Sequence, residues 1–368
     1  MMPGGKERLR VLMTVDALGG VWSYATELIA ALERHGVEVA LATMGRPLSS
    51  DLREQARRFE NVQLFESSYK LEWMEDPWAD VAAAAEWLLK IEKLFSPDVI
   101  HLNGFVHGVL PFEAPVLTVG HSCVLSWWRA VFKSEAPATW SQYKKAVAAG
   151  LRLSSRVIAP TQTMLDSLAS DYGPFENSGV IANARDPRMF AAAAKEPFVF
   201  AAGRVWDQAK NIAALDRAAP GLQWPVLIAG EERDPNGART TLENVQLLGR
   251  LSGTAVAERL SRAAIYAHPA RYEPFGLAVL EAALSECALV LGNIPSLREN
   301  WNGAAVFVPA DDSQELRRAL RKLIDDEPRR KLLGAQAAER ARAFSPEKMA
   351  EQYFSAYCQM LSGMASAA

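Results

Sequence analysis

The chain has 368 residues, enough for two domains of ordinary size. Hydrophobic residues make up 49% and charged residues 23%, a balance typical of a globular protein, which argues against intrinsic disorder. The formal net charge of -3 leaves no basic excess to neutralise phosphates, so a nucleic-acid partner is not expected.

Cysteine usage and the N-terminal sequence favour a cytoplasmic protein. Cys123, Cys287 and Cys358 form no C-x-x-C pair, which fits reduced thiols better than a disulfide or zinc framework. Residues 1–7 lack the apolar core of a signal peptide. The sequence has no run of about 18 apolar residues, so a transmembrane helix is not expected. Peripheral contact with the inner face of a membrane stays open, as does the oligomeric state.

Apolar runs alternate with amphipathic segments through the first half of the chain. Residues 9–15 have strand character, residues 21–35 carry apolar side chains at helical spacing, and Gly36 follows as a C-cap. Residues 38–43 return to strand character, and this β-α-β opening predicts a parallel, doubly wound sheet. Further strands are expected at 62–65, 98–102, 116–120, 156–159 and 180–182, and helices at 80–95, 137–153 and 161–172. Thr161 is the expected N-cap of the last of these helices.

A second series of this kind begins after a loop-like stretch near residue 187. Its strands are expected at 198–202, 226–229, 245–248, 265–268, 288–291 and 305–308, each followed by a helical pattern. Two doubly wound halves predict two Rossmann-like domains, whose ligands bind at the carboxyl ends of the strands. Residues 345–361 begin with a Ser-Pro-Glu start and predict a packing helix. Its apolar stripe consists of Met349, Tyr353, Phe354, Tyr357, Met360 and Leu361.

The strongest local motif is residues 270–281 (ARYEPFGLAVLE), directly after the expected strand at 265–268. Pro274 suits the first position of a helix, which makes Glu273 the N-cap. The unpaired amides of the first turn then belong to Phe275, Gly276 and Leu277. Such a helix start attracts anions through its free N–H groups and its macrodipole.

Glu281 lies on the same expected helix, about 12 Å beyond Glu273 at 1.5 Å per residue. A diphosphate at the helix start therefore leaves one carboxylate for a nearby sugar and the other for a ribose, because hydroxyl pairs bind well to carboxylates. The alternative is a helix with an acidic N-cap and an exposed Glu281.

A second motif, residues 202–211 (AGRVWDQAKN), directly follows the strand at 198–202. A glycine turn followed by two cations suits an anionic ligand, since Arg204 can chelate a phosphate and Lys210 supplies a point charge. Two surface cations on a loop are the alternative.

Two weaker features lie in the first half. Gly19 and Gly20, within residues 16–21 (DALGGV), let the backbone approach a ligand at a helix start, although a G-x-G-x-x-G fingerprint is absent. His121 follows the strand at 116–120, where clefts form. A structural hydrogen bond is the alternative role for this histidine.

Several catalytic motifs are absent from the sequence. It contains no G-x-S-x-G elbow, P-loop, H-E-x-x-H or metal-binding Asp-x-Asp. Metal-assisted chemistry is therefore not expected, and Arg204 and Lys210 would neutralise a leaving diphosphate instead.

Together, and in this order, these motifs resemble glycosyltransferase family 4, a retaining family. The most specific part is EPFGL at 273–277 with Glu281; residues 97–101 (PDVIH), 180–183 (VIAN) and 244–249 (NVQLLG) support it. The resemblance implies an α/β protein of the GT-B fold, with two Rossmann-like doubly wound parallel-sheet domains facing a central cleft. It also implies a C-terminal helix that crosses back to pack on the N-terminal domain. The expected domains are 1–187 on the acceptor side, 188–344 on the nucleotide-sugar donor side, and the helix at 345–368.

The resemblance also implies roles for the motif residues. Arg204 and Lys210 would hold the diphosphate, Glu281 the ribose hydroxyls and Glu273 the donor sugar. The amides of Gly276 and Leu277 would face the phosphate or sugar, and Phe275 belongs to the same donor-binding set. The remaining implied contacts are Arg250 and Leu251 beside the base, Gly19 and Gly20 closing on the donor, and His121 beside the transferred sugar.

The chain departs from the family pattern at four points, one of which is Ala184 after Asn183, where glycine is usual. Five residues separate Arg204 from Lys210 where the family commonly has four, and Asn211 stands where glycine is frequent. Asn103 lies in a segment where the family often carries histidine, so contacts on the acceptor side are not carried over.

The implied function is a retaining, metal-independent hexosyltransferase without a cofactor. A nucleotide-diphosphate sugar, with a UDP-sugar favoured over a GDP-sugar, would donate to a hydroxyl group of a saccharide, glycolipid or small molecule. A nucleotide-sugar epimerase of the same fold and a non-catalytic sugar-binding protein stay open as alternatives. The aromatic-rich stretches 66–78 and 126–140, expected as loops, would bind an acceptor, touch lipid headgroups or pack within the cleft wall.

Overall fold

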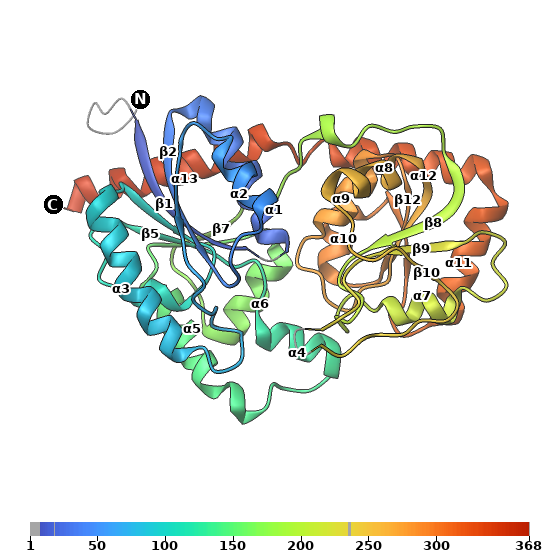
Figure 1. Ribbon diagram of the computed structural model, residues 1–368, viewed down its shortest axis with the longest axis horizontal. Helices are drawn as coiled ribbons and strands as arrows, with labels where there is room; N and C mark the ends of the chain where they lie inside the picture. The colour runs from blue at the N-terminus through green and yellow to red at the C-terminus, as the bar shows by residue number, and fades with distance from the viewer. Residues whose placement is uncertain (1–7, 18, 235–236, 368) are drawn as a thin grey trace. The chain divides into compact units, whose positions relative to one another are not determined.

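The computed structural model describes residues 8–17, 19–234 and 237–367, and it divides into two compact units (Figure 1). The first comprises Met1–Trp128, Ser134–Ala184 and Pro346–Ala368, and the second comprises Arg129–Lys133 and Arg185–Ser345. Residues 1–7, expected to lack a signal-peptide core, lie outside the described part of the chain. So does Leu18, which belongs to the expected glycine motif at residues 16–21. The assignment of acceptor and donor sides to the two halves stays a prediction.

The first unit is built on a seven-stranded parallel sheet in the order β3-β2-β1-β4-β5-β6-β7. Its strands are β1 (Leu9–Asp16), β2 (Val37–Met44), β3 (Val62–Glu66), β4 (Val99–Leu102), β5 (Val116–Val119), β6 (Arg156–Ala159) and β7 (Ser178–Val180). The central strands are apolar on both faces because helices cover both sides, as expected for a doubly wound sheet. The strand order reverses between β1 and β4, so the carboxyl ends of these two strands border the switch point of the sheet.

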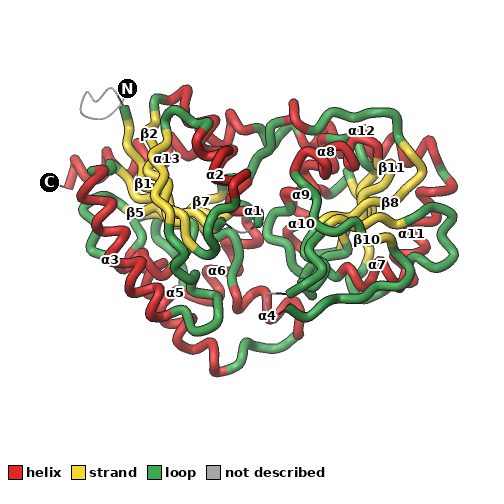
Figure 2. The backbone as a smooth tube through the Cα atoms, viewed as in Figure 1, coloured by secondary structure: helices red, strands yellow, loops and turns green. Residues whose placement is uncertain are grey.

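The helices of this unit are α1 (Gly20–Leu32), α2 (Ser50–Arg57), α3 (Trp78–Phe95), α4 (Val124–Phe132), α5 (Ser141–Leu153) and α6 (Gln162–Tyr172), with short 3-10 turns at Glu33–His35, Val106–Val109 and Ala138–Trp140. Two predicted caps are confirmed: Gly36 is left-handed at φ 67°, and Thr161 accepts a hydrogen bond from the Met164 amide at 3.1 Å. Helices α2 and α4 were not predicted. Because α4 occupies much of residues 126–140, the expectation of a loop there was wrong (Figure 2). Its mixed aromatic and basic sequence obscured the helical spacing.

The last helix, α13 (Pro346–Ala367), returns to the first unit and packs against α1, as the resemblance implied (Figure 1). The predicted apolar stripe makes this contact. Met349, Tyr353, Tyr357 and Met360 are buried in the same core cluster as the apolar face of α1.

The second unit carries a six-stranded parallel sheet in the order β10-β9-β8-β11-β12-β13. Its strands are β8 (Glu196–Ala202), β9 (Val226–Ala229), β10 (Gln246–Leu247), β11 (Ala263–His268), β12 (Ala288–Gly292) and β13 (Ala305–Val308). Its helices are α7 (Ile212–Ala218), α8 (Gly253–Arg262), α9 (Leu277–Leu284), α10 (Pro295–Trp301), α11 (Ser313–Asp325) and α12 (Glu327–Ala341), and a 3-10 turn lies at Pro187–Met189. Here the order reverses between β8 and β11.

Two Rossmann-like parallel sheets are therefore confirmed, with one difference from the expected pattern. Within the described residues no helix lies between β9 and β10, although a helix was expected after every strand of this half. The connection is made by turns and the isolated bridge between Arg233 and Arg239. Across the described part of the chain, no helix is both long and apolar enough to cross a bilayer.

Candidate functional site

Glu273 is the centre of a charged cluster in the second unit. It lies in the loop after β11, and its Oε2 atom accepts two hydrogen bonds, one from Lys210 Nζ at 2.6 Å and one from His268 Nε2 at 2.9 Å. Lys210 lies in the loop after β8 and His268 is the last residue of β11. The strands that carry them are neighbours across the switch point, where a doubly wound sheet binds its ligands.

The cluster keeps Glu273 ionised. Burial raises the pKa of this carboxyl group, but the charge of Lys210 and the hydrogen bond from His268 outweigh burial, so its pKa lies well below the ordinary value. Both donors use the same oxygen, and among the described residues no hydrogen bond reaches Oε1. That oxygen is therefore left to accept from a hydroxyl group of a ligand.

The helix expected to begin at Pro274, with Glu273 as its N-cap, begins three residues later. Helix α9 starts at Leu277, and its N-cap is Gly276 in the left-handed region at φ 92°. The predicted N-cap role of Glu273, and its position on one helix with Glu281, were therefore wrong. Tertiary hydrogen bonds override the local preference of Pro274: Ser296 Oγ donates to the Glu273 carbonyl at 2.6 Å.

Glu281 lies on α9 and is not exposed, contrary to the simpler alternative for this residue. Arg185 Nε lies 2.8 Å from its Oε1 atom, and the two side chains are only 13% and 15% exposed. Burial raises the pKa of Glu281, and the charge of Arg185 offsets part of that rise. The carboxylate thus has one strong partner and lies at the same sheet edge as Glu273.

Arg204 and Lys210 come from one loop but have different partners. Arg204 Nη2 lies 2.8 Å from Asp207 Oδ2, and its guanidinium group lies 5.2 Å from the centre of the Trp206 ring. The side chain of Arg204 is 48% exposed, whereas Lys210 is mostly buried against Glu273. Arg204 is accordingly the more available of the two cations for an incoming anion.

Asn211 explains how this loop tolerates a residue other than glycine. Its φ of 56° is left-handed, a conformation that asparagine adopts more readily than most side chains. Its Nδ2 atom donates to the carbonyls of Pro269 at 2.8 Å and Ala310 at 2.7 Å. These bonds tie the loop of Lys210 to the loops that follow β11 and β13.

Arg250 lines a hollow of about 410 Å³ at the carboxyl ends of β9 and β10. The other lining residues are Gly230, Glu231, Glu232, Arg233, Arg239 and Gly249. Leu251 directly follows Arg250 but does not line the hollow. Close backbone approach shapes this edge, because a Cβ atom on Gly230 would lie 1.7 Å from the Gly203 carbonyl oxygen.

Gly19, Gly20 and His121 belong to the first unit. Gly19 is the N-cap of α1 at φ 77°, and a Cβ atom built there would meet nothing within 4 Å, so the backbone faces open space. His121 follows β5, and its Nε2 atom lies 2.7 Å from Asn103 Oδ1. Burial lowers the pKa of His121 to about 3, so its ring is neutral near pH 7.

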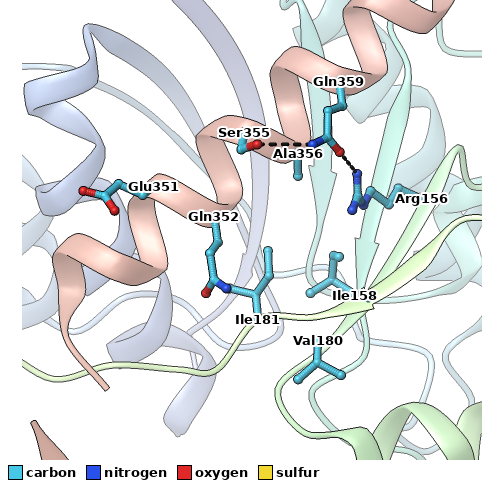
Figure 3. Close-up of a pocket in the computed structure, with 10 residues that line it drawn as sticks. Arg156, Ile158, Val180, Ile181, Glu351, Gln352, Ser355, Ala356 and Gln359 are labelled. Atoms are coloured by element: carbon cyan, nitrogen blue, oxygen red, sulfur yellow. Dashed lines mark hydrogen bonds between the residues drawn. The ribbon is translucent and has the colours of Figure 1, made fainter. Parts of the chain in front are cut away.

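A second hollow, of about 280 Å³, contains none of the predicted site residues (Figure 3). It lies in the first unit between α13 and the strands β6 and β7, where Arg156 donates a 2.7 Å hydrogen bond to Gln359. It is therefore not associated with the cluster around Glu273.

His268 and Arg185 were not predicted to be site residues. The sequence contained a signal for His268, because a histidine at the end of a strand and five residues before Glu273 can contact that glutamate. The sequence contained no signal for Arg185, because this residue and its partner Glu281 are far apart in the chain. Among the described residues, no group of three or more His, Cys, Asp or Glu side chains is arranged to hold a metal ion.

Comparisons with known proteins agree with this architecture. The family described as Glycosyltransferase Family 4 matches residues 18–188, and Glycosyl transferases group 1 matches residues 184–340. Glycogen synthase from Mycobacterium tuberculosis is 27% identical over 283 residues, which cover 69% of this chain and 65% of the synthase. The match thus spans less than two thirds of that relative's length.

Solved structures show the same fold. Sucrose-phosphate synthase from Thermosynechococcus elongatus superimposes with a TM-score of 0.81 at 19% identity, covering 97% of this chain and 100% of that one. HepE from Anabaena, in complex with UDP-glucose, superimposes with a TM-score of 0.73 at 18% identity and the same coverage of both chains.

The two parallel sheets and the returning C-terminal helix define a GT-B protein. The two family matches together span residues 18–340, and the chain belongs to the glycosyltransferases of group 1 and family 4.

Proposed function

We propose that this glycosyltransferase moves a hexose from a nucleotide-diphosphate sugar to an acceptor hydroxyl group, with retention at the anomeric carbon and without a metal ion. The observation that carries the proposal is the cluster of Lys210, His268 and Glu273 at the switch point of the second sheet. An ionised carboxylate and a mostly buried cation thus lie together at a switch point, where doubly wound sheets bind their ligands, and this supports a sugar-diphosphate site there.

The donor sugar would bind at the second unit. The free Oε1 atom of Glu273 would accept from a sugar hydroxyl group, and Glu281, aligned by Arg185, would accept from the ribose. The hollow beside Arg250 would take the base. We favour a UDP-sugar, and glucose among the hexoses, because HepE binds UDP-glucose and two other similar proteins make glycogen and sucrose phosphate.

Three groups at one edge of the second sheet would stabilise the negative charge that develops on the leaving diphosphate. Arg204 would exchange part of its contact with Asp207 for a phosphate oxygen, and Lys210 would share its charge between Glu273 and the diphosphate. The amide groups at the start of α9, around Gly276 and Leu277, add an uncharged donor set. Such preorganised donors stabilise a developing anion at no reorganisation cost.

Proton transfer would follow a front-face route. Glu273 and Glu281 would bind hydroxyl groups of the donor, and neither would attack the anomeric carbon. The leaving diphosphate would therefore take the proton of the acceptor hydroxyl group as the new glycosidic bond forms. His121 would lie beside the transferred sugar. The acceptor would be a saccharide, a glycolipid or a small molecule.

A transfer assay tests the proposal. The protein is incubated with UDP-glucose, GDP-glucose or ADP-glucose and a panel of saccharide and glycolipid acceptors, with and without EDTA. We expect a glycosylated product whose anomeric configuration, read by proton NMR, matches the donor, and a rate that EDTA leaves unchanged. An epimer formed from the donor alone would favour an epimerase. Donor binding without product would favour a non-catalytic protein.

Variants of the central ion pair make the test specific to this site. Lys210→Met should lower kcat by roughly 10²–10³, the usual effect of removing one preorganised donor. Glu273→Gln removes the charge that pairs with Lys210, and we expect a loss of kcat of similar size. Lys331→Met is the matched control, because Lys331 forms an ion pair with Glu327 that is exposed and remote from the cluster in the chain. Turnover close to that of the unaltered protein in both cluster variants would overturn the proposal.

A further inference from the structure

Three neighbouring strands of the first sheet bring Thr14, Asn103 and His121 together. Thr14 is on β1, Asn103 directly follows β4, and His121 follows β5. The strands are adjacent in the order β1-β4-β5, so these residues share one carboxyl edge beside the switch point. Asn103 is the residue that links the other two.

The amide of Asn103 is locked in one orientation. Its backbone N–H donates to Thr14 Oγ1 at 2.9 Å, and its Nδ2 atom donates to the Thr14 carbonyl oxygen at 2.7 Å. A carbonyl oxygen can only accept, so the amide nitrogen must face Thr14. The amide oxygen Oδ1 is thereby directed at His121.

This orientation selects one tautomer of His121. Its Nε2 atom lies 2.7 Å from Asn103 Oδ1, an atom that only accepts, so Nε2 carries the proton. In a neutral ring the other nitrogen, Nδ1, then holds a lone pair. No described residue makes a hydrogen bond to Nδ1.

The surroundings of the ring keep it neutral. The titratable groups packed near it are Tyr24, whose ring centroid is 4.5 Å away edge-on, and His101, which Tyr24 contacts in turn. Burial raises the pKa of Tyr24 well above its ordinary value and lowers that of His101 to about 3. Near pH 7 the ring of His121 therefore has two uncharged neighbours and, as burial lowers its own pKa to about 3, no charge of its own.

We propose that Asn103 is a positioning residue that fixes His121 in its neutral, Nε2-protonated tautomer, so that Nδ1 presents a lone pair to a hydroxyl group of the substrate. The part that concerns the substrate rests on the proposed transferase function, whereas the tautomer does not. The consequence is a histidine that accepts a hydrogen bond at one nitrogen and is held by the protein at the other.

Imidazole NMR of the protein labelled with ¹⁵N-histidine tests the tautomer without any turnover. The resonances of His121 are those absent from a His121→Gln variant. We expect one protonated nitrogen, Nε2, and no titration of the ring between pH 8 and pH 5. A ring protonated at Nδ1, a mixture of tautomers, or a charged ring near pH 7 would overturn the proposal.

Two substitutions of Asn103 test its role. Asn103→Leu removes the acceptor, so we expect a mixed tautomer spectrum and a kcat about 5- to 10-fold lower, the effect of one neutral hydrogen bond, with little change in the affinity for UDP. Asn61→Leu is the matched control, since Asn61 Nδ2 also donates to a strand carbonyl, that of Val37, at the other end of the sheet. It should change neither the His121 spectrum nor kcat.

Asn103→Asp provides a readout that a purely structural role would not move. A carboxylate beside Nε2 should raise the pKa of His121, and the protonated ring has two donors and no lone pair. The pH–rate profile should then gain an acidic limb whose midpoint equals the NMR titration of His121, while thermal unfolding reports whether the variant is folded. A tautomer and turnover unchanged in Asn103→Leu would contradict the proposal even if Asn103→Asp failed to fold. Absence of transfer with every donor would instead contradict the proposed function and leave the NMR result to decide the tautomer.

Discussion

Gly276 sets the position of Glu273, because its left-handed backbone separates the loop of Glu273 from α9. A side chain at φ 92° is strained, and a Cβ atom would also lie 3.2 Å from Val279 Cγ2 and 3.4 Å from Glu273 Cγ. The residue that joins the loop to the helix therefore also limits where the carboxylate can lie.

Gly276→Ala should cost about 1–2 kcal/mol of unfolding free energy and reduce transfer more than this cost explains. The reason is that strain at residue 276 is relieved by moving Glu273. Urea unfolding and kcat measure the two effects. Gly253→Ala is the control, since Gly253 is at the start of α8 and a Cβ atom there meets nothing within 4 Å. Equal effects of the two substitutions would show that the backbone at Gly276 is not under this constraint.

A second prediction at the scale of residues concerns the ion pair of Arg185 and Glu281. Arg185→Met should leave a buried carboxylate without its cation and destabilise the protein by about 3 kcal/mol or more. Glu281→Gln on the same background should recover part of that loss, because the uncompensated charge is gone. Thermal unfolding of the single and double variants measures the coupling. Additive effects would mean that the two side chains do not interact.

At the scale of elements, α13 is joined to the first sheet by a polar contact as well as by its apolar stripe. Tyr357 OH lies 2.7 Å from His101 Nδ1, and Tyr24 OH of α1 lies 3.2 Å from His101 Nε2. All three side chains are buried. The histidine on β4 thus connects the first and last helices of the chain.

Tyr357→Phe should lower the free energy of unfolding by about 1–2 kcal/mol, because it leaves a buried ring nitrogen of His101 without its partner. Tyr69→Phe is the comparison, since the half-buried Tyr69 packs its ring on Trp87 and its hydroxyl group bonds no described residue. Denaturant unfolding distinguishes the two. A loss as small in Tyr357→Phe as in Tyr69→Phe would show that the contact with His101 adds nothing.

At the scale of the whole molecule, buried ionisable groups of both units predict acid sensitivity. Burial lowers the pKa of both His101 and His121 to about 3, from about 6.5 in an unfolded chain. The unfolded chain therefore binds protons that the native protein does not, and stability is lost as the pH falls from about 6.5 towards 3. Glu273, whose native pKa is also lowered, adds a loss of the same sign below about pH 4.3.

The expected slope is up to about 1.4 kcal/mol per pH unit for each histidine. His101 lies on β4 and His121 follows β5. Hydrogen exchange at the amides of these two strands measures the slope between pH 7 and pH 5. A His101→Gln variant should show about half the slope, if it folds. Protection that does not change with pH would contradict neutral, buried histidines.

Much of the molecule follows from the sequence alone. The strands of both sheets, the caps at Gly36 and Thr161 and the stripe of α13 were predictable, because burial imposes a local period on the chain and caps use local hydrogen bonds. Arg204, Lys210 and Glu273 could be singled out as candidate donor-binding residues because each follows the end of an expected strand, and Glu281 because it continues the motif of Glu273. Their roles in binding stay predictions.

Only the tertiary structure decided how these residues are paired. Lys210 and Glu273 are 63 positions apart, and their contact depends on β8 and β11 being neighbours in the sheet. The same holds for Arg185 with Glu281, for Asn103 with His121, and for the start of α9, where hydrogen bonds to the loop of Glu273 displace the helix start favoured by Pro274. Local sequence determines which elements form, whereas the partner of a buried polar group is set by strands and loops that meet only in the folded chain.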